Sequence, residues 1–204
     1  MPKRANDVIK DKQEDQSCGR LPEIGWYRGV IRPCHVWQGR IFISGMGREI
    51  MINILGQIED NKLPDIETER LYLRQRLVSD AEDIFAYASL PEVTWPAGFP
   101  PAESVEEEEN YLENIMPKRW IEQKIPSGYG ICLKGTDEVI GSIDFNHRHA
   151  DDVLEMGYLL HPDYWGQGIV TEAARALLEV GFTLLNLHKI EIGCYSYNKA
   201  SQRI

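Results

Sequence analysis

Cysteine is scarce in this chain, and the few cysteines are scattered. The 204 residues hold four of them, and none forms a CxxC pair. Without paired spacing, neither a zinc site nor a disulfide framework is predicted. We therefore expect reduced thiols, no metal and a cytoplasmic location. The four positions are Cys18, Cys34, Cys132 and Cys194.

Long apolar runs and an excess of basic residues are also lacking. No apolar run approaches the roughly 18 residues that a membrane span requires. The N-terminal stretch MPKRANDVIKDKQEDQ has basic residues but no apolar core, so it does not predict a secretory signal. The formal net charge is −10, whereas a nucleic-acid binder needs clustered Lys and Arg to neutralise phosphates. Neither a membrane nor a nucleic acid is expected as a partner.

The charge divides the chain in two. Residues 1–63 carry ten Lys+Arg and eight Asp+Glu, which leaves twelve and twenty-four for the remaining 141 residues. The change lies near Leu63 and Pro64. We therefore expect a partly disordered extension over 1–63 and one folded domain over 64–204.

The segment 24–58 carries the clearest pattern of the extension. It predicts a short strand over Arg40–Ser44, a glycine turn and an amphipathic helix over about Glu49–Ile58. The stretch FISGMGREIMINIL also looks somewhat like one strand–loop–helix unit of Rossmann-like methyltransferases. A structural extension and such a unit both remain open.

From Ile66 onward the pattern predicts an α+β domain. IETERLYLRQR alternates as a half-buried strand, and VSDAEDIFAYASL follows as a helix capped by Ser79 or Asp80. SVEEEENYLENIMPKRWIEQ reads as one helix, with acidic residues first and basic residues last, the order that the helix dipole favours.

The second half of this domain predicts a sheet with one crossover. Three strands joined as antiparallel hairpins are expected, then a helix, a further strand and the start of another helix. Together these elements indicate a mostly antiparallel mixed sheet with flanking helices and one strand–helix–strand crossover. The expected ranges are 129–134, 139–147 and 153–160 for the hairpin strands, 170–185 for the helix, and 189–196 for the last strand.

Two glycines stand where the crossover helix begins. In HPDYWGQGIVTEAARALLEVGF, Gly166 and Gly168 separate a predicted strand from the helix. The first N–H groups of a helix have no partner within it, so the segment can cradle an anion. A tight turn requires glycine as well, and residue types alone leave both interpretations open.

Four stretches decide between these interpretations. TERLYLR, GSIDF, EMGYLLHPDYWGQGIVTEAARALLEVGF and KIEIGCYSYNKASQRI, in this order, resemble the GNAT N-acetyltransferase family. Within it they are similar to the RimJ/RimL-like branch of ribosomal-protein N-acetyltransferases, over about residues 66–204. The resemblance implies the GNAT acyl-CoA N-acyltransferase fold. It also implies direct acetyl transfer from acetyl-CoA to a primary amine, either a protein N-terminus or a small-molecule amine.

The resemblance also implies where acetyl-CoA binds. The loop would hold the pyrophosphate on backbone N–H groups, and Val170 stands where the family has Gly or Ala, so its methyls crowd the phosphates unless they point away. The strand before the loop would splay from Lys189–Ser196 and offer N–H groups to the thioester and pantetheine. Asn198 would contact the cofactor or a bound water, and Ser201 fills a small polar position. The loop residues are Trp165, Gly166, Gln167, Gly168, Ile169 and Val170, and the strand residues are Leu159 and Leu160.

Acetyl transfer also requires a group that removes a proton from the amine. Glu155, on the strand before the loop, is the first candidate, although a polar residue on a solvent face would look the same. His147 and His149 are alternatives with a suitable intrinsic pKa, in what is predicted to be a hairpin loop. The tyrosine that serves as general acid in many family members would fall one position beyond Ile204.

The family resemblance breaks off at the last helix. In the family this helix continues and is followed by strands that cover one edge of the sheet, so we expect those strands to be missing and the edge to be open. Residues 24–58 offer one clear strand, which we do not expect to substitute. Two alternatives follow: a truncated CoA-binding fragment without turnover, and a non-catalytic module that recruits a partner. A homodimer also stays open.

Overall fold

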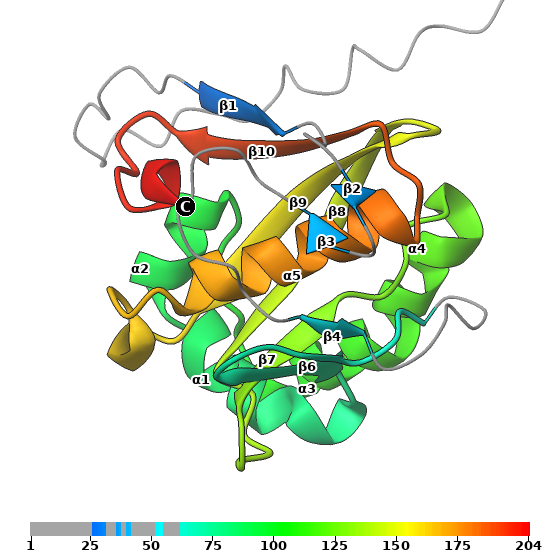
Figure 1. The fold of residues 1–204 in the computed structure, drawn as a ribbon. Coiled ribbons are helices and arrows are strands. Elements are labelled where there is room, and N and C mark those ends of the chain that lie inside the picture. The colour runs from blue at the N-terminus through cyan, green and yellow to red at the C-terminus, as the bar shows by residue number, and fades with distance from the viewer. Residues whose placement is uncertain (1–25, 32–35, 38–39, 42–51, 55–61) are drawn as a thin grey trace, which may run out of the picture.

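The computed structural model describes residues 26–31, 36–37, 40–41, 52–54 and 62–204. An eight-stranded sheet in the order β1-β10-β9-β8-β7-β6-β5-β4 forms its centre (Figure 1). All neighbouring strands are antiparallel except β9 and β10. The expected α+β fold with one parallel crossover is confirmed. The strands of the sheet are β1 (Trp26–Ile31), β4 (Asn53–Ile54), β5 (Ile66–Glu67), β6 (Leu71–Gln75), β7 (Tyr129–Leu133), β8 (Gly141–Ala150), β9 (Val153–Leu160) and β10 (Lys189–Tyr195).

Helices lie on both faces of this sheet. The segment predicted as one acidic-to-basic helix is α3 and α4 joined by a π-helical turn, and Pro117 in this region lacks an N–H for regular α-helical bonding. The side chain of Ser104 caps α3 by accepting from the Glu107 N–H at 3.3 Å. The helices are α1 (Ala81–Ala88), α2 (Pro91–Thr94), α3 (Val105–Asn110), the π turn (Tyr111–Ile115), α4 (Met116–Gln123) and α5 (Ile169–Thr183).

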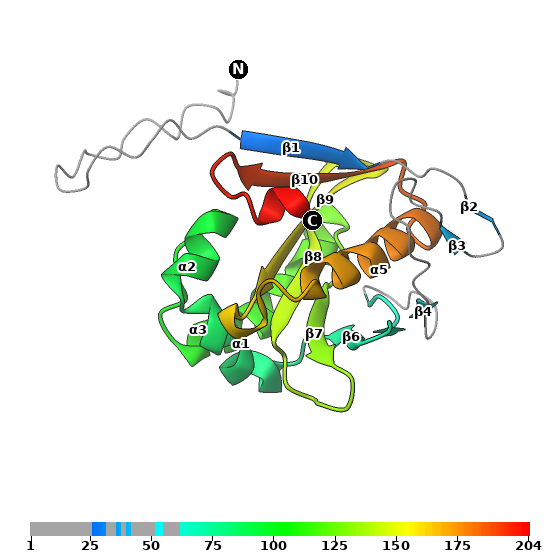
Figure 2. The ribbon, with the colours of Figure 1, turned by 60° about the vertical axis from the view of Figure 1, so that its left-hand side comes forward.

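Alternation along the strands separates two layers of core. Leu71 and Leu73 of β6 are fully buried beneath α5, whereas Tyr72 between them packs on the side of α1–α4. On β7, Ile131 and Cys132 divide in the same way. Figure 2 shows α5 crossing one face of the sheet, with α1, α2 and α3 gathered on the other side. Period-two burial on the strands therefore produces a three-layer arrangement.

The helix predicted over about Glu49–Ile58 is wrong where the structure describes it. Asn53–Ile54 is the strand β4, which pairs antiparallel with β5 and places Ile54 opposite Ile66. Ile52 and Ile54 pack against the main core. Pairing with β5 and burial outweigh the helical pattern of this short apolar run. The glycine turn and the rest of the predicted helix lie outside the described residues, as does the end of the predicted strand Arg40–Ser44 beyond Ile41; β3 (Arg40–Ile41) pairs with β2 (Val36–Trp37).

The expected open edge is also wrong, because β1 covers it. This strand pairs antiparallel with β10 over six residues, from Trp26 opposite Tyr195 to Ile31 opposite Ile190. A single strand suffices, because an edge presents only one row of N–H and C=O groups to be paired. The N-terminal segment thus contributes one strand at each edge of the sheet: β1 beside β10, and β4 beside β5.

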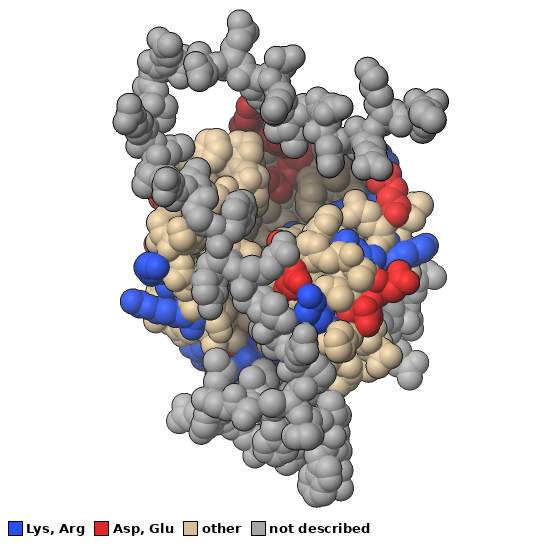
Figure 3. Space-filling view, turned by 90° about the horizontal axis from the view of Figure 1, so that it is seen from above, with Lys and Arg blue, Asp and Glu red and all other residues tan. Residues whose placement is uncertain are grey.

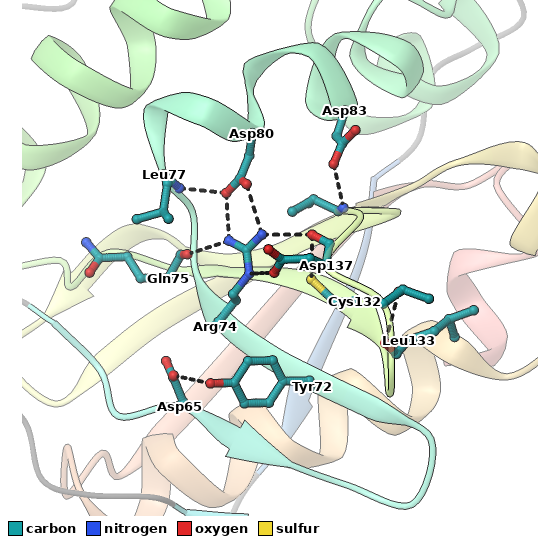
Figure 4. Close-up of polar contacts among 12 residues, drawn as sticks. Asp65, Tyr72, Arg74, Gln75, Leu77, Asp80, Asp83, Cys132, Leu133 and Asp137 are labelled. Carbon is teal, nitrogen blue, oxygen red and sulfur yellow. Dashed lines mark hydrogen bonds and ion pairs between the residues drawn. The ribbon is translucent and has the colours of Figure 1, made fainter.

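A compact polar cluster fastens β6 to the first helical turn. The guanidinium of Arg74 donates to both carboxylate oxygens of Asp80, at 2.7 and 2.9 Å, and to Asp137 at 3.2 Å (Figure 4). Asp80, predicted as a helix cap, also accepts from the Leu77 N–H at 2.7 Å, at the start of a 3-10 turn (Val78–Asp80) rather than of α1. Attraction to Asp80 raises the pKa of Arg74 although burial opposes it. The cluster holds α1 against the sheet.

Tyr72 is expected to make stability fall at high pH. Its hydroxyl donates to Asp65 at 2.5 Å, and this hydrogen bond, followed by burial, raises the pKa of Tyr72 from 10.0 to about 12. The stabilisation is therefore complete below pH 10.0 and is lost as the pH rises through about 12. Urea unfolding at about pH 9 and about pH 11.5 should show a larger loss for the wild type than for Tyr72→Phe. Equal losses in both proteins would contradict this.

Candidate functional site

The two parallel strands separate after a short paired stretch. Their pairing runs only from Lys189 opposite Val153 to Ile192 opposite Met156. Beyond these pairs β9 continues to Leu160 and β10 to Tyr195. The predicted splay is therefore present, and it creates an opening whose closed end lies at the last paired residues.

The other edge of β9 decides which N–H groups face this opening. The His161 N–H donates to the Ile140 carbonyl at 2.9 Å, and the register pairs Leu159 with Ser142. Because hydrogen-bonded pairs alternate in an antiparallel ladder, the Leu159 N–H faces β8. The N–H groups of Leu160 and Tyr158 point the opposite way, toward β10. Of the two predicted strand donors, only Leu160 presents its N–H to the opening.

The glycine loop lies at the open end, just before α5. Gly166 and Gly168 have φ of 72° and 74°, a left-handed conformation that side chains disfavour. A Cβ built on Gly166 meets no atom of the described part of the chain within 4 Å, so there is free space above the loop. The Trp165 indole N–H donates to the Leu160 carbonyl at 2.8 Å, and the Gln167 amide donates to the Asp163 carbonyl at 2.9 Å. Both side chains are thus used to brace the loop.

Val170 does not crowd this loop. Its side chain and that of Ile169 are buried in the core beneath α5. The methyls point away from the loop, and only the backbone N–H groups of the first turn remain to receive an anion. The replacement of Gly or Ala by Val is therefore compatible with a phosphate cradle.

A second bracing contact joins the loop to a distant turn. Glu172, in the first turn of α5, accepts from Thr68 Oγ1 at 2.6 Å, from the Arg70 N–H at 2.8 Å and from Arg70 Nε at 2.7 Å. Burial alone would raise the pKa of Glu172, but these hydrogen bonds and the guanidinium charge hold it below its ordinary value. Arg70 Nη1 also donates to the Gln167 carbonyl at 2.9 Å. The sequence analysis did not predict a role for Thr68, Arg70 or Glu172.

Glu155 stands at the closed end of the opening. It lies between Leu154 and Met156, which face α5, so its side chain is on the opposite face, with α1–α4. Its carboxylate is 2.9 Å from His149 Nε2 and is only 25% exposed. Glu155 is therefore not simply a polar residue on a solvent-exposed face of the sheet. Glu155 is the last residue but one on β9 that pairs with β10.

His147 and His149 belong to β8 and not to a hairpin loop. The strand extends to Ala150 because two register irregularities let it follow β9 further than the apolar pattern indicates. This places His147 opposite Glu155 in the register, with its ring 4.5 Å from that of His149. The ring hydrogen-bonded to the Glu155 carboxylate is that of His149.

A further glutamate faces the same point from β10. Glu191 pairs with Glu155 across the two strands and is buried. One of its oxygens is 2.6 Å from Lys189 Nζ, and the other is 3.5 Å from His149 Nε2. Donor atoms of His149, Glu155 and Glu191 lie within 4.8 Å of one another, a set with the chemistry of metal ligands as well as of a proton acceptor. Nothing in the sequence spacing indicates this group.

The predicted C-terminal contacts gather near the free part of β9. Asn198 accepts from the Ser201 N–H at 3.1 Å, at the start of a 3-10 turn over Ser201–Arg203. Tyr158 on β9 is partly buried, and this burial raises its pKa, whereas the nearby Ser201 lowers it. Asn198 and Ser201 thus lie by the opening and away from Glu155, so the structure brings together two groups of predicted residues at its two ends.

Within the ranges that the structure describes, no helix is long and apolar enough to cross a membrane.

A family model for the acetyltransferase (GNAT) domain matches residues 70–204. The uncharacterized N-acetyltransferase YoaA of Bacillus subtilis (strain 168) is 34% identical over 146 residues, 69% of this chain and 79% of that protein.

Two solved structures share the fold. An acetyltransferase (GNAT family) from Bacillus anthracis is 27% identical with a TM-score of 0.58, over 68% of this chain and 78% of that one. RimL, a ribosomal L7/L12 alpha-N-protein acetyltransferase solved with coenzyme A, gives a TM-score of 0.58 at 20% identity, over 66% of this chain and 76% of that one. These two structures show the shared fold, and the family match together with the YoaA relative shows that the chain belongs to the GNAT acetyltransferase family.

Proposed function

We propose that this protein transfers the acetyl group of acetyl-CoA to a primary amine by direct attack. One observation carries the proposal: the opening between β9 and β10 has the glycine loop and the first turn of α5 at its open end and the Glu155 carboxylate at its closed end. Residues 64–204 would form the transferase domain, and 1–63 an extension that lends strands to its sheet. A cytoplasmic location accords with the scattered cysteines.

The opening suits a long, thin donor. The pyrophosphate would bind the N–H groups of Trp165 to Val170, and the pantetheine arm would follow the Leu160 and Tyr158 N–H groups. From Leu160 back to Glu155 the strand advances about 17 Å at its usual rise. This separation leaves the thioester, and not the phosphates, beside the carboxylate. Asn198 and Ser201 would contact the arm from the C-terminal side.

The residues at the closed end supply the proton chemistry. Glu155, aligned by its hydrogen bond to His149, takes a proton from the ammonium of the acceptor and leaves a neutral amine. The amine nitrogen then bonds to the thioester carbon, and backbone N–H groups facing the opening stabilise the negative charge on the carbonyl oxygen. The C–S bond breaks with its electron pair on sulfur, and the nitrogen loses its second proton as the amide forms. The thiolate takes up this proton and leaves as CoA.

The acceptor would approach from the face that carries α1–α4. Glu155 and Glu191 both lie on that face, and a view from above shows acidic side chains within a hollow of the surface (Figure 3). Negative charge in a recess raises the local concentration of cations. An amine that is protonated in solution, on a protein N-terminus or a small molecule, fits this field.

A thiol-release assay with acetyl-CoA and a panel of primary amines tests the function. Amine-dependent release of CoA with formation of the N-acetyl product, identified by mass spectrometry, is the expected result. Saturable CoA binding without turnover would favour the non-catalytic CoA-binding alternative. A folded protein that binds no CoA would refute both.

A further inference from the structure

Arg70 connects two parts of the chain that sequence reasoning treated separately. It lies in the turn between β5 and β6, yet its guanidinium reaches the loop before α5. We propose that Arg70 is the positioning residue of the phosphate cradle, because it fixes the peptide between Gln167 and Gly168. This inference rests on the proposed function and assigns to a residue outside the loop the task of shaping it.

The geometry of one peptide bond carries the inference. Arg70 Nη1 donates to the Gln167 carbonyl at 2.9 Å. In a trans peptide the C=O and the following N–H point in opposite directions. Holding the Gln167 carbonyl toward Arg70 therefore turns the Gly168 N–H away from it, into the set of donors that receives the pyrophosphate. A glycine in the left-handed region has several other conformations available, so this external hold is needed.

The guanidinium is itself held rigidly for this task. The Glu172 carboxylate accepts from Arg70 Nε at 2.7 Å and from the Arg70 backbone N–H at 2.8 Å. It also accepts from the Thr68 hydroxyl at 2.6 Å. Arg70 Nη2 lies close to Gly168, 3.6 Å from where a Cβ would stand. The planar fork thus serves Glu172 and Gln167 together, which the single ammonium of lysine cannot reproduce.

The ion pair of Arg70 and Glu172 also affects the charge near the glycine loop. A carboxylate in the first turn of α5 would repel a bound pyrophosphate. Glu172 is buried, and Arg70 balances its charge. The guanidinium, 44% exposed, leaves positive charge next to the loop. The arrangement combines a fixed N–H donor with a local field that attracts anions.

Arg70→Lys is expected to weaken CoA binding about tenfold, since a charge-assisted hydrogen bond that orders the cradle is lost. Isothermal titration with CoA measures this without turnover. In the assay, KM for acetyl-CoA should rise by a similar factor while kcat is kept. With S-acetyl-pantetheine, which lacks the pyrophosphate, kcat/KM should stay at the wild-type value.

The matched control is Lys134→Met. Lys134 is bonded through its backbone to the Arg70 carbonyl at 2.8 Å, but its side chain pairs with exposed Glu67. It should bind CoA like the wild type. Should Arg70→Lys prove unstable, the double variant Arg70→Met with Glu172→Gln removes the hold without leaving a buried charge, and the same loss of CoA affinity is expected.

Two results would overturn the inference: unchanged CoA affinity in both Arg70 variants, or an equal fall in kcat/KM with both donors. The second result would mean that Arg70 only maintains the fold. If the wild type binds CoA but does not turn over, the titrations still decide the role of Arg70 while the proposed function fails. A wild type that binds no CoA overturns both.

Discussion

Glu155→Gln should lower kcat by roughly 100- to 1,000-fold, the range in which a positioned general base contributes. The amide has nearly the shape of the carboxylate and can still contact His149, so the closed end of the opening should keep its packing. The amide cannot accept the proton that the acceptor's ammonium must lose before the amine attacks. The KM for acetyl-CoA should change little, because the cradle lies at the other end of β9.

Steady-state kinetics at saturating acetyl-CoA, with CoA affinity measured separately, check this expectation. Glu67→Gln is the matched control, because the Glu67 side chain on β5 is 42% exposed and pairs with Lys134, and it should keep full activity. His149→Gln should cause a smaller loss, about tenfold, because it disturbs the orientation of Glu155 and not the proton acceptor itself. Wild-type kcat in Glu155→Gln would show that another group removes the proton.

The local elements of the fold could be predicted from the sequence, because their signals are local. Leu71 and Leu73 alternate with polar neighbours, and the strand Val153–Leu160 was predicted with its observed bounds. The positions of β1 and β4 could not be predicted in this way. Each is fixed by pairing with a strand far along the chain, and a short apolar run carries no record of its partner.

In the candidate site too, residues close in the sequence could be predicted, whereas residues brought together from distant segments could not. The glycine loop and Glu155 lie within fourteen residues of one another, in one continuous pattern that a reader of the sequence can follow. Arg70 and Glu172 are 102 residues apart, and each has an ordinary local explanation, as a strand residue and as an acid in the first turn of a helix. Glu191 carries no local signal of its own within its strand. Only the register of β9 and β10 brings it to Glu155.

Asp144→Ala should cost about 3–5 kcal/mol of stability, the usual effect of removing one partner of a buried ion pair. Arg76 is almost wholly buried, and its Nη2 is 2.8 Å from Asp144, which also lies 3.6 Å from Arg119. Burial, the largest single influence, would lower the pKa of Arg76, but attraction to Asp144, Tyr111 and Tyr87 and the hydrogen bond to Asp144 together raise it. Without the Asp144 carboxylate, the guanidinium groups of Arg76 and Arg119 lose the negative charge that they share.

Urea unfolding compares this variant with Glu67→Ala, which breaks an exposed pair with Lys134 and should cost at most about 1 kcal/mol. The double variant Arg76→Met with Asp144→Leu should recover most of the loss, because two apolar side chains replace two charges that were costly to desolvate. A cost for Asp144→Ala no greater than that of Glu67→Ala would show that solvent reaches this pair. The comparison therefore measures how dry the layer is between the sheet and α1–α4, the same face on which Glu155 must meet its amine.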